Sequence, residues 1–333
     1  MPGGRQERTA AADSPPPRSG TGSRSMDQDR YNRTNAAGTA ASTCGPRAAL
    51  ALALLILGSW PLAGTAATLL FDDFNGTSLD QSVWRLPTGA GTFFGRTQIK
   101  PAFYFGQDLR PVVAGGTVTL QLDTYNASAA TPGDSFWGQE IQTFQRFAIG
   151  ADGLSVKARM RFLGNPPGGL VGGFFTWGFD NGLRDELDFE LLTNFVNAPF
   201  AFTNVYQNAD FNTGGIGLNL FVPGFDMKAW NTYEIRWWQD RTEWWINGVM
   251  VRQQNGLNLT HDSEIRLNIW APDAGFSIAY NSFLQPAASA AANQQYQLEI
   301  DYVQVSTVPV PAAVWLFGSG FALLVGLRRK YGV

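Results

Sequence analysis

Cysteine and histidine are almost absent from this sequence of 333 residues, which contains one of each. This scarcity excludes a zinc site, a disulfide framework and a catalytic triad that pairs histidine with a nucleophilic cysteine. The single cysteine, Cys44, lies upstream of residues 47–67, which have the pattern of a cleaved signal peptide, as described below. The mature protein should therefore contain no cysteine.

Charged residues are also scarce. Asp, Glu, Lys and Arg make up 15% of the chain, below the ~25% that is usual for soluble proteins. The formal net charge is −3, which gives no electrostatic basis for binding nucleic acid. We therefore expect no nucleic-acid partner, and the uncharged polar residues must keep the protein in solution.

The acidic residues that are present include a dense run at 185–191, which reads D-E-L-D-F-E-L. Strict alternation predicts a β-strand with one apolar face and one face that carries Glu186, Asp188 and Glu190. Carboxylates ~6.6 Å apart on that face repel by roughly 2.5 kcal/mol at an effective dielectric of about 20. A favourable cross-strand pair contributes only about 0.2–1 kcal/mol. No Lys or Arg is interleaved among the three acids, so the pattern indicates carboxylate chemistry.

Hydrolysis of a glycosidic bond suits these acids, because it needs one protonated and one ionised carboxyl group. Crowding separates the pKa values of neighbouring acids. Glu186 and Glu190 would be the nucleophile and the acid/base, with Asp188 holding protons between them. Their Cα atoms lie ~13 Å apart on a flat strand, and two Glu side chains could close most of the gap to the about 5–5.5 Å of a retaining enzyme. A solvated strand face and a calcium site are the alternatives.

The rest of the middle region predicts an all-β domain. Short alternating segments recur with turn signals between them, and neither a long helical period nor an internal repeat is apparent. Asn247-Gly248 predicts a type I′ hairpin. Trp238 and Trp245 are expected to pack rather than to bind ligand. We predict a two-sheet jelly-roll sandwich whose concave sheet holds the cleft.

The run D-E-L-D-F-E resembles the E-[aliphatic]-D-x-E signature of glycoside hydrolase family 16, which includes lichenases, laminarinases and xyloglucan endotransglycosylases. The single residue between Asp188 and Glu190 is similar to the unbulged strand of lichenases. The resemblance implies a concanavalin A-like lectin/glucanase fold over residues 68–306. It extends to five flanking segments, namely Phe71–Gly76, Gly173–Trp177, Thr203–Tyr206, Leu267–Trp270 and Glu299–Val303.

The resemblance also implies roles for individual residues. Glu186 would be the nucleophile, Asp188 the assisting acid and Glu190 the acid/base, with no cofactor required. Asp301 would join backbone carbonyls in a structural calcium site. The predicted substrate-binding residues are Glu140, Trp177, Arg184, Asn204, Tyr206 and Trp270.

Some positions depart from the lichenase pattern. Arg184 stands where lichenases often have an aromatic residue, and Gln142 stands where they often have Arg. Ala271-Pro272-Asp273 replaces the usual polar run. The resemblance therefore implies intact chemistry with altered sugar-binding subsites.

The N-terminal region should not belong to the folded domain. Residues 1–46 are rich in Gly, Ser, Ala, Pro and Arg and are expected to be disordered. Residues 47–67 have the pattern of a secretory signal peptide: a cation, the apolar run 48–57 and small residues before the domain. Met1 and Met26 remain alternative starts.

The C-terminal residues 308–333 contain an apolar stretch, 312–327, followed by Arg328-Arg329-Lys330. This segment resembles the PEP-CTERM sorting tail that exosortases process, and a plain membrane anchor is the alternative. The resemblance implies a Gram-negative bacterium, signal peptidase and an exosortase as processing partners, transient attachment to the inner membrane, and final release outside the cell or at its surface.

Three functions therefore compete. The first is a secreted, monomeric, endo-acting β-glycan hydrolase that retains configuration and acts on a β-glucan or on exopolysaccharide. A transglycosylase on β-glucans is a close variant. A lectin-like or structural matrix protein is the non-catalytic alternative, because the fold does not fix the function. A lectin has no need of three acids on one strand face, which favours the enzyme.

Overall fold

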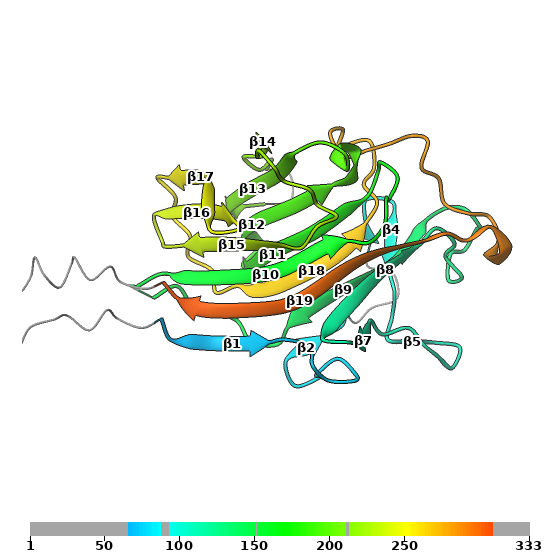
Figure 1. Cartoon of the computed structure of the whole chain (residues 1–333), viewed down its shortest axis with the longest axis horizontal. Coiled ribbons are helices and arrows are strands. Elements are labelled where there is room, and N and C mark those ends of the chain that lie inside the picture. Colours follow the sequence, from blue (N-terminus) through cyan, green and yellow to red (C-terminus); the bar gives the residue numbers. More distant parts are fainter. Residues whose placement is uncertain (1–65, 88–92, 151, 211–212, 309–333) are drawn as a thin grey trace, which may run out of the picture. The chain divides into compact units, whose positions relative to one another are not determined.

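The computed structural model describes residues 66–87, 93–150, 152–210 and 213–308. Strands of two antiparallel sheets make up most of this region (Figure 1). We call them the cleft sheet and the outer sheet. The cleft sheet contains, in spatial order, β14 (Leu218–Phe221), β13 (Phe200–Ala209), β12 (Leu183–Leu192), β11 (Val171–Asp180), β18 (Glu264–Trp270), β9 (Phe136–Thr143) and β2 (Trp84–Arg85).

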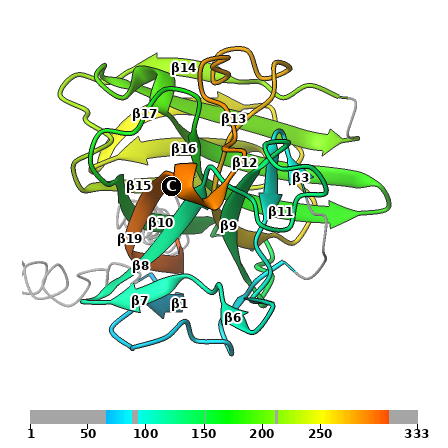
Figure 2. The same ribbon diagram turned by 90° about the vertical axis from the view of Figure 1, so that its right-hand side faces the viewer.

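The outer sheet is organised around its longest strand, β19 (Gln295–Thr307), which pairs with β10, β8 and β1 (Figure 2). Its order is β17 (Val249–Asn255), β16 (Arg241–Ile246), β15 (Asn231–Trp237), β10 (Leu154–Phe162), β19, β8 (Thr117–Asp123) and β7 (Val112–Ala114), with β1 (Thr68–Asp72) also on β19.

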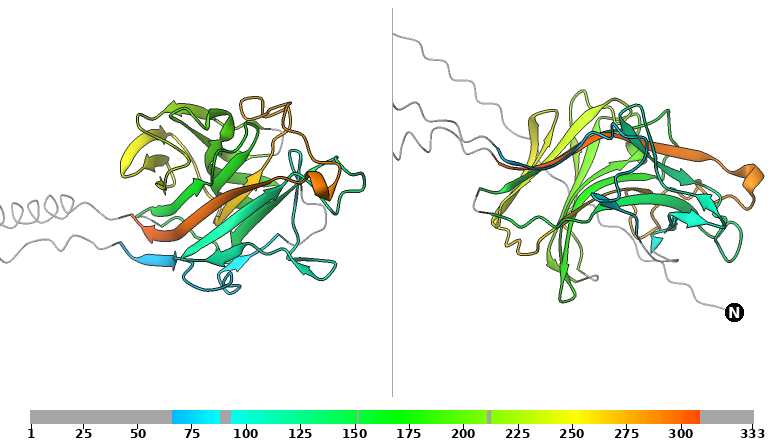
Figure 3. Two further views of the ribbon diagram at one scale, coloured as in Figure 1. Left: turned by 45° about the vertical axis from the view of Figure 1, so that its right-hand side comes forward. Right: turned by 90° about the horizontal axis from the view of Figure 1, so that it is seen from below.

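The two sheets meet at β9. Its first half pairs in parallel with β4 (Thr97–Ile99) and touches β8 at the pair Asp123 and Trp137. Both sheets are visibly curved (Figure 3). The remaining elements are β3 (Phe93–Phe94), the hairpin β5 (Phe103–Tyr104) and β6 (Gln107–Asp108), and the 3₁₀ turns η1 (Thr193–Phe195) and η2 (Ala290–Ala292).

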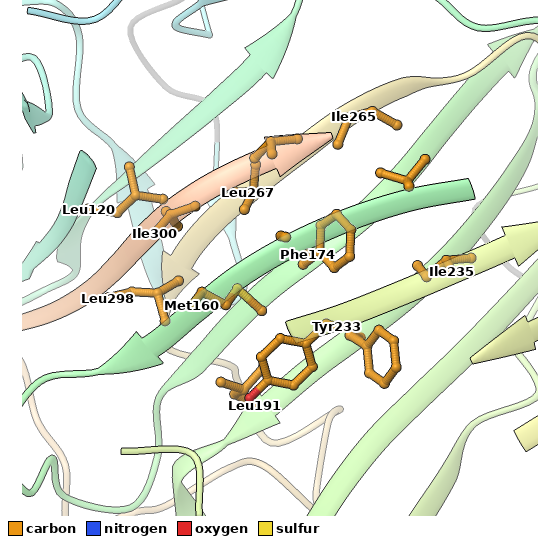
Figure 4. Close-up of a cluster of buried hydrophobic side chains, with 14 of the residues drawn as sticks. Leu120, Met160, Phe174, Leu191, Tyr233, Ile235, Ile265, Leu267, Leu298 and Ile300 are labelled. Carbon is orange, nitrogen blue, oxygen red and sulfur yellow. The ribbon is translucent and has the colours of Figure 1, made fainter. Parts of the chain in front are cut away.

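The hydrophobic core fills the space between the sheets. Phe174 and Leu267 reach it from the cleft sheet, and Met160, Tyr233 and Leu298 reach it from the outer sheet (Figure 4). All five side chains are fully buried. Burial of such a side chain contributes about 1.5–3 kcal/mol relative to leaving it in water, so the core fixes the position of each strand that carries the site.

The acidic strand is β12, and its alternation confirms the sequence prediction. Leu187, Phe189 and Leu191 are buried in the core. Because side chains alternate across a strand, the acids at the intervening positions lie on the opposite face. Pairing between β11 and β12 runs without a register shift from Val171 to Leu192, so the acidic run contains no bulge relative to β11.

The predicted hairpin is confirmed as well, since β16 and β17 join at Asn247 and Gly248 with φ angles of 50° and 78°. The two tryptophans expected to pack do so outside the core. Trp238 and Trp245 are half-buried and lie beneath the guanidinium groups of Arg241 and Arg236. The tryptophans that fill the core are Trp84, Trp237 and Trp244.

The predicted two-sheet jelly-roll sandwich is confirmed. The predicted disordered extension, most of the signal peptide and the sorting segment lie outside the described residues. Within the described part of the chain, no helix has the length and apolar character needed to cross a membrane.

Candidate active site

Three cross-strand rows bring the predicted residues together on the cleft sheet. Tyr206, Glu186 and Trp177 form one row across β13, β12 and β11. The next row joins Asn204, Asp188, Phe175 and Arg266, and the third joins Phe202, Glu190, Gly173 and Asn268. Residues directly opposite each other on paired strands share a face, so the three rows lie on one face of the sheet and the three acids stand in one line along β12.

The rows form the floor of a cleft of about 500 Å³. All three acids line it, as do the predicted substrate-binding residues Trp177, Arg184, Asn204, Tyr206 and Trp270. Aromatic rings stand on both sides of the acids. Trp270 stacks on Phe276 with ring centroids 6.2 Å apart, and Trp177 stacks on Phe179 at the same centroid distance. The cleft therefore combines central carboxyl groups with apolar walls, the usual composition of a site for a small or chain-like ligand.

Glu186 has a cationic neighbour on its own strand. Arg184 Nε lies 3.1 Å from Glu186 Oε2, and the guanidinium carbon is 3.8 Å from the centroid of the Tyr206 ring and 5.6 Å from that of Trp177. This corrects the expectation that no basic residue relieves the repulsion, because Arg184 occupies the position two residues before the first acid. Burial raises the pKa of Glu186 to about 7, while the charge of Arg184 and a hydrogen bond with Asp188 act in the opposite direction.

Asp188 is the most enclosed of the three acids, with 4% of its surface exposed. Burial raises its pKa well above the ordinary value, and the charges of Glu186 and Glu190 raise it further. A protonated Asp188 can donate a hydrogen bond to Glu186, which favours the ionised form of Glu186. Trp244 Nε1 donates to the backbone oxygen of Asp188 at 3.0 Å, so a core side chain fixes the strand from below.

Glu190 has a different environment. Within the described residues no hydrogen bond or ion pair to its carboxyl group is found. Burial raises its pKa to about 8, and the charge of Glu186 adds to the shift. Its neighbour on β11 is Gly173, where a Cβ atom would collide with Asn268 Oδ1 on the next strand. The absence of a side chain at Gly173 keeps the surface beside Glu190 open.

Glu140 lies beside the cleft but does not line it. Its side chain is buried, and it accepts hydrogen bonds from Asn268 Nδ2 at 2.9 Å and from Gln142 Nε2. Arg266 Nη1 is 3.5 Å from the same carboxylate and also pairs with Glu264. Glu140 thus supports Asn268 and Arg266 in the described structure, and its contact with sugar stays a prediction.

Several residues that line or border the cleft were not predicted as site residues. Phe94, Asn268 and Phe276 line it, and Arg266 lies behind Trp177 with its guanidinium carbon 4.7 Å from the ring centroid. Asn268 Oδ1 is buried without a hydrogen-bond partner in the described chain. The alternation of Leu267–Trp270 placed Asn268 on the polar face of its strand, and that signal could have identified it.

Asp301, the predicted calcium ligand, lies on β19 and forms an ion pair with Arg159. The guanidinium already balances its charge, and an adjacent cation opposes the binding of another. Within the described residues, no group of three or more Asp, Glu, His or Cys side chains is arranged to hold a metal ion. The donor set at Asp301 thus does not favour calcium, and the calcium site stays a prediction from resemblance.

A curved β-sandwich with three neighbouring carboxyl groups in an aromatic-walled cleft defines a glycoside hydrolase. Residues 103–304 match the sequence profile of the family described as Glycosyl hydrolases family 16, and the chain belongs to that family.

Individual relatives agree with this placement. A β-glucanase from Brevibacillus brevis is 27% identical over 215 residues, which cover 62% of this chain and 71% of the relative. A β-1,3-1,4-glucanase (lichenase) from a mouse hindgut metagenome has a similar structure, with a TM-score of 0.55, 19% identity, and coverage of 72% of this chain and 98% of the other. The catalytic domain of an endo-1,3-β-glucanase (laminarinase) from Thermotoga petrophila has a TM-score of 0.56 at 14% identity, covering 73% and 98%. Both solved structures therefore have the same fold as this chain.

Proposed function

We propose that the protein is a secreted endo-acting β-glucan hydrolase that retains the anomeric configuration. The observation that carries this proposal is the unbroken register of β12 with β11, which places Glu186, Asp188 and Glu190 in one line on the floor of the cleft. Their environments differ in the way that a double displacement requires, since Glu186 has a cation beside it and Glu190 has no ion-pair partner among the described residues.

In the first step the Glu186 carboxylate attacks the anomeric carbon while Glu190 gives its proton to the leaving glycosidic oxygen. The C–O bond to the leaving sugar breaks, and an ester between Glu186 and the retained sugar forms. In the second step Glu190 accepts a proton from water. The resulting hydroxide attacks the anomeric carbon and releases Glu186 as a carboxylate.

Arg184 and Asp188 keep Glu186 ionised for these two reaction steps. The Arg184 guanidinium favours the ionised form of Glu186 before the attack, and a proton on Asp188 hydrogen-bonds to the same carboxylate. Glu190 keeps its proton because it is buried near another acid. Aromatic rings such as Trp177 and Trp270 offer flat apolar surfaces to the faces of sugar rings on either side.

The choice of a β-glucan rests on relatives whose names are β-glucanase, lichenase and laminarinase. Exopolysaccharide of the producing cell is an additional candidate polymer, motivated by the similarity of residues 308–333 to a sorting tail. The signal-like segment 47–67 supports the proposal that the protein is secreted.

The test is a panel of mixed-linkage glucan, laminarin, xyloglucan, agarose and host exopolysaccharide, with products identified by mass. We expect oligosaccharides from at least one β-glucan, and an initial β-anomer in the proton NMR spectrum. Glu186→Gln should lower kcat by at least about 10³-fold while the fold persists. An initial α-anomer, or appreciable turnover by Glu186→Gln, would remove Glu186 as the nucleophile. Products that are only longer chains would indicate transglycosylation.

A further inference from the structure

A second pocket, of about 690 Å³, lies on the outer face of the outer sheet. Strands β8 and β19 form its floor, and the segment from Gln107 to Val112 forms one wall. In Figure 2, β8 runs between β19 and β9, and β7 lies alongside. The second pocket is larger than the catalytic cleft, and no residue lines both of them.

The strand β9 separates the two pockets. Glu140 and Gln142 on one face support the catalytic cleft, whereas Trp137 and Gln139 line the second pocket. These positions alternate along the strand, so they point to opposite faces. The second pocket is therefore not an extension of the cleft.

Asp123 organises the floor of the second pocket. Its buried carboxylate pairs with Lys100 and accepts hydrogen bonds from Gln121 Nε2 at 3.0 Å, Asn293 Nδ2 at 2.7 Å and Gln295 Nε2 at 2.9 Å. Four donors hold one acid in place, so these amides are oriented before any ligand arrives.

The charges around the second pocket are balanced internally. Lys100 is neutralised by Asp123. The other lining charges pair in the same way, Arg110 with Asp108 at 2.6 Å and Glu299 with Arg161 at 2.7 Å. An ionic ligand would have to compete with these pairs. The pocket is therefore suited to an uncharged ligand.

The groups that remain available are amides and aromatic rings. No hydrogen bond to another described residue involves the side-chain amide of Gln107 or Gln297, and the half-buried Tyr125 ring stacks on no other described ring. Trp137 is 5% exposed, and its buried indole N–H has no acceptor in the described chain. Amides both donate and accept hydrogen bonds, and aromatic faces attract the slightly positive C–H edges of a sugar ring.

We propose that the second pocket binds a neutral saccharide chain. The proposal rests on the proposed function only for the choice of polymer. The amides recognise hydroxyl groups and Tyr125 supports a ring face. A polysaccharide held at the outer sheet would stay bound to the enzyme while another stretch of the same polymer occupies the cleft. The local concentration of substrate would then rise without any new contact in the cleft.

Calorimetric titration of the Glu186→Gln protein with a hexasaccharide prepared from mixed-linkage β-glucan tests this proposal, since that variant should not cleave the ligand. We expect two binding sites per chain. In the same background, Tyr125→Ala with Gln297→Ala should weaken one site by about tenfold or more, because it removes a ring surface and a neutral hydrogen bond. The other site should be unchanged.

Gln304→Ala is the matched control, because Gln304 is a half-buried glutamine on the same strand β19 that does not line the second pocket. It should retain two sites, and circular dichroism should confirm that all variants are folded. A parent protein with one site or none would overturn the proposal, as would two unaltered sites in the double variant. Hydrolysis of the glucan by the wild-type enzyme is measured separately and reports on the proposed function alone.

Discussion

At the scale of single residues, two identical side chains acquire different properties from their neighbours. Glu186 lies 3.1 Å from the guanidinium of Arg184, whereas Glu190 has no ion-pair partner within the described chain. The pKa of Glu186 is raised to about 7 and that of Glu190 to about 8, in both cases mainly by burial. The acid next to the cation is the one that ionises first, as a nucleophile must, and the other retains its proton.

Arg184 should therefore set the acidic limb of the pH profile. Arg184→Met removes the charge that lowers the pKa of Glu186, so more of the nucleophile is protonated at a given pH. We expect the acidic limb of kcat/KM to move to higher pH by about one unit. Arg184→Lys keeps the charge and should shift the limb less. An acidic limb that does not move in Arg184→Met would show that Arg184 contributes only through packing or substrate contact.

Glu190 should make stability depend on pH. A carboxyl group whose folded pKa is raised from 4.5 to about 8 binds more protons in the folded than in the unfolded state between those values, so stability falls as pH rises through that window. Glu190→Gln removes this loss. We expect its Tm to exceed that of the wild type at pH 8, by about 2–4 °C for each kcal/mol relieved, and to differ little at pH 4.5.

The control for this prediction is Glu299→Gln, which removes a carboxylate that pairs with Arg161 at 2.7 Å on the outer sheet. It should show no gain in Tm at pH 8. An equal gain in both variants would mean that net charge, not the buried site, governs the pH dependence.

The sequence predicted the acids and three of the six aromatic side chains that line the cleft, because these residues lie within short motifs. It could not predict the charge balance, which depends on neighbouring strands. Arg266 and Asn268 come from β18, nearly 80 positions from Glu190, and Glu140 comes from β9. Whether Glu140 touches sugar or supports Asn268 depends on side-chain depth, which alternation does not specify.

At the scale of elements, β11 packs closely between β12 and β18, and a glycine at its centre leaves room for a substrate. Gly173 faces Glu190 on one side and Asn268 on the other. Any side chain at this position meets Asn268 Oδ1 and must displace it. The open space at the centre of the site thus depends on the absence of a side chain at Gly173.

Gly173→Ala should therefore impair catalysis more than a surface change would. Overpacking of this kind costs about 1–3 kcal/mol, and a displaced Asn268 would intrude on the space beside Glu190. We expect a loss of at least about tenfold in kcat/KM with the protein still folded at 25 °C. Gly150→Ala is the control, because a Cβ atom there meets nothing within 4 Å. Wild-type kinetics in Gly173→Ala would contradict the proposed role of the open surface.

Local chemistry explains which elements were predictable. Asn247-Gly248 specified its hairpin because both residues tolerate positive φ. Alternation specified β12 because one face is buried. The parallel contact of β4 with β9 had no such local signal. The placement of Trp238 and Trp245 beneath arginines on the outer sheet had no local signal either, because it depends on strand pairing.

At the scale of the whole molecule, the catalytic domain is one part of a longer chain whose ends carry proposed processing signals. We predict that the extracellular protein ends near residues 308–311. Val308-Pro309-Val310-Pro311, the apolar stretch 312–327 and Arg328-Arg329-Lys330 together resemble a sorting tail that is removed. Mass spectrometry of protein recovered outside the cell should find no peptide beyond that region. A peptide that contains Arg328 in this fraction would indicate a plain anchor.

The position of β19 has a consequence for how the protein folds. This strand, Gln295–Thr307, lies between β10 on one side and β1 and β8 on the other, so the outer sheet cannot close before residue 307 has been synthesised. Its partners lie more than 130 residues earlier in the chain, and such distant pairings form slowly. We expect a long-lived incomplete state with exposed strand edges, which is prone to aggregate. A chain that stops before Gln295 should accordingly show no cooperative thermal transition.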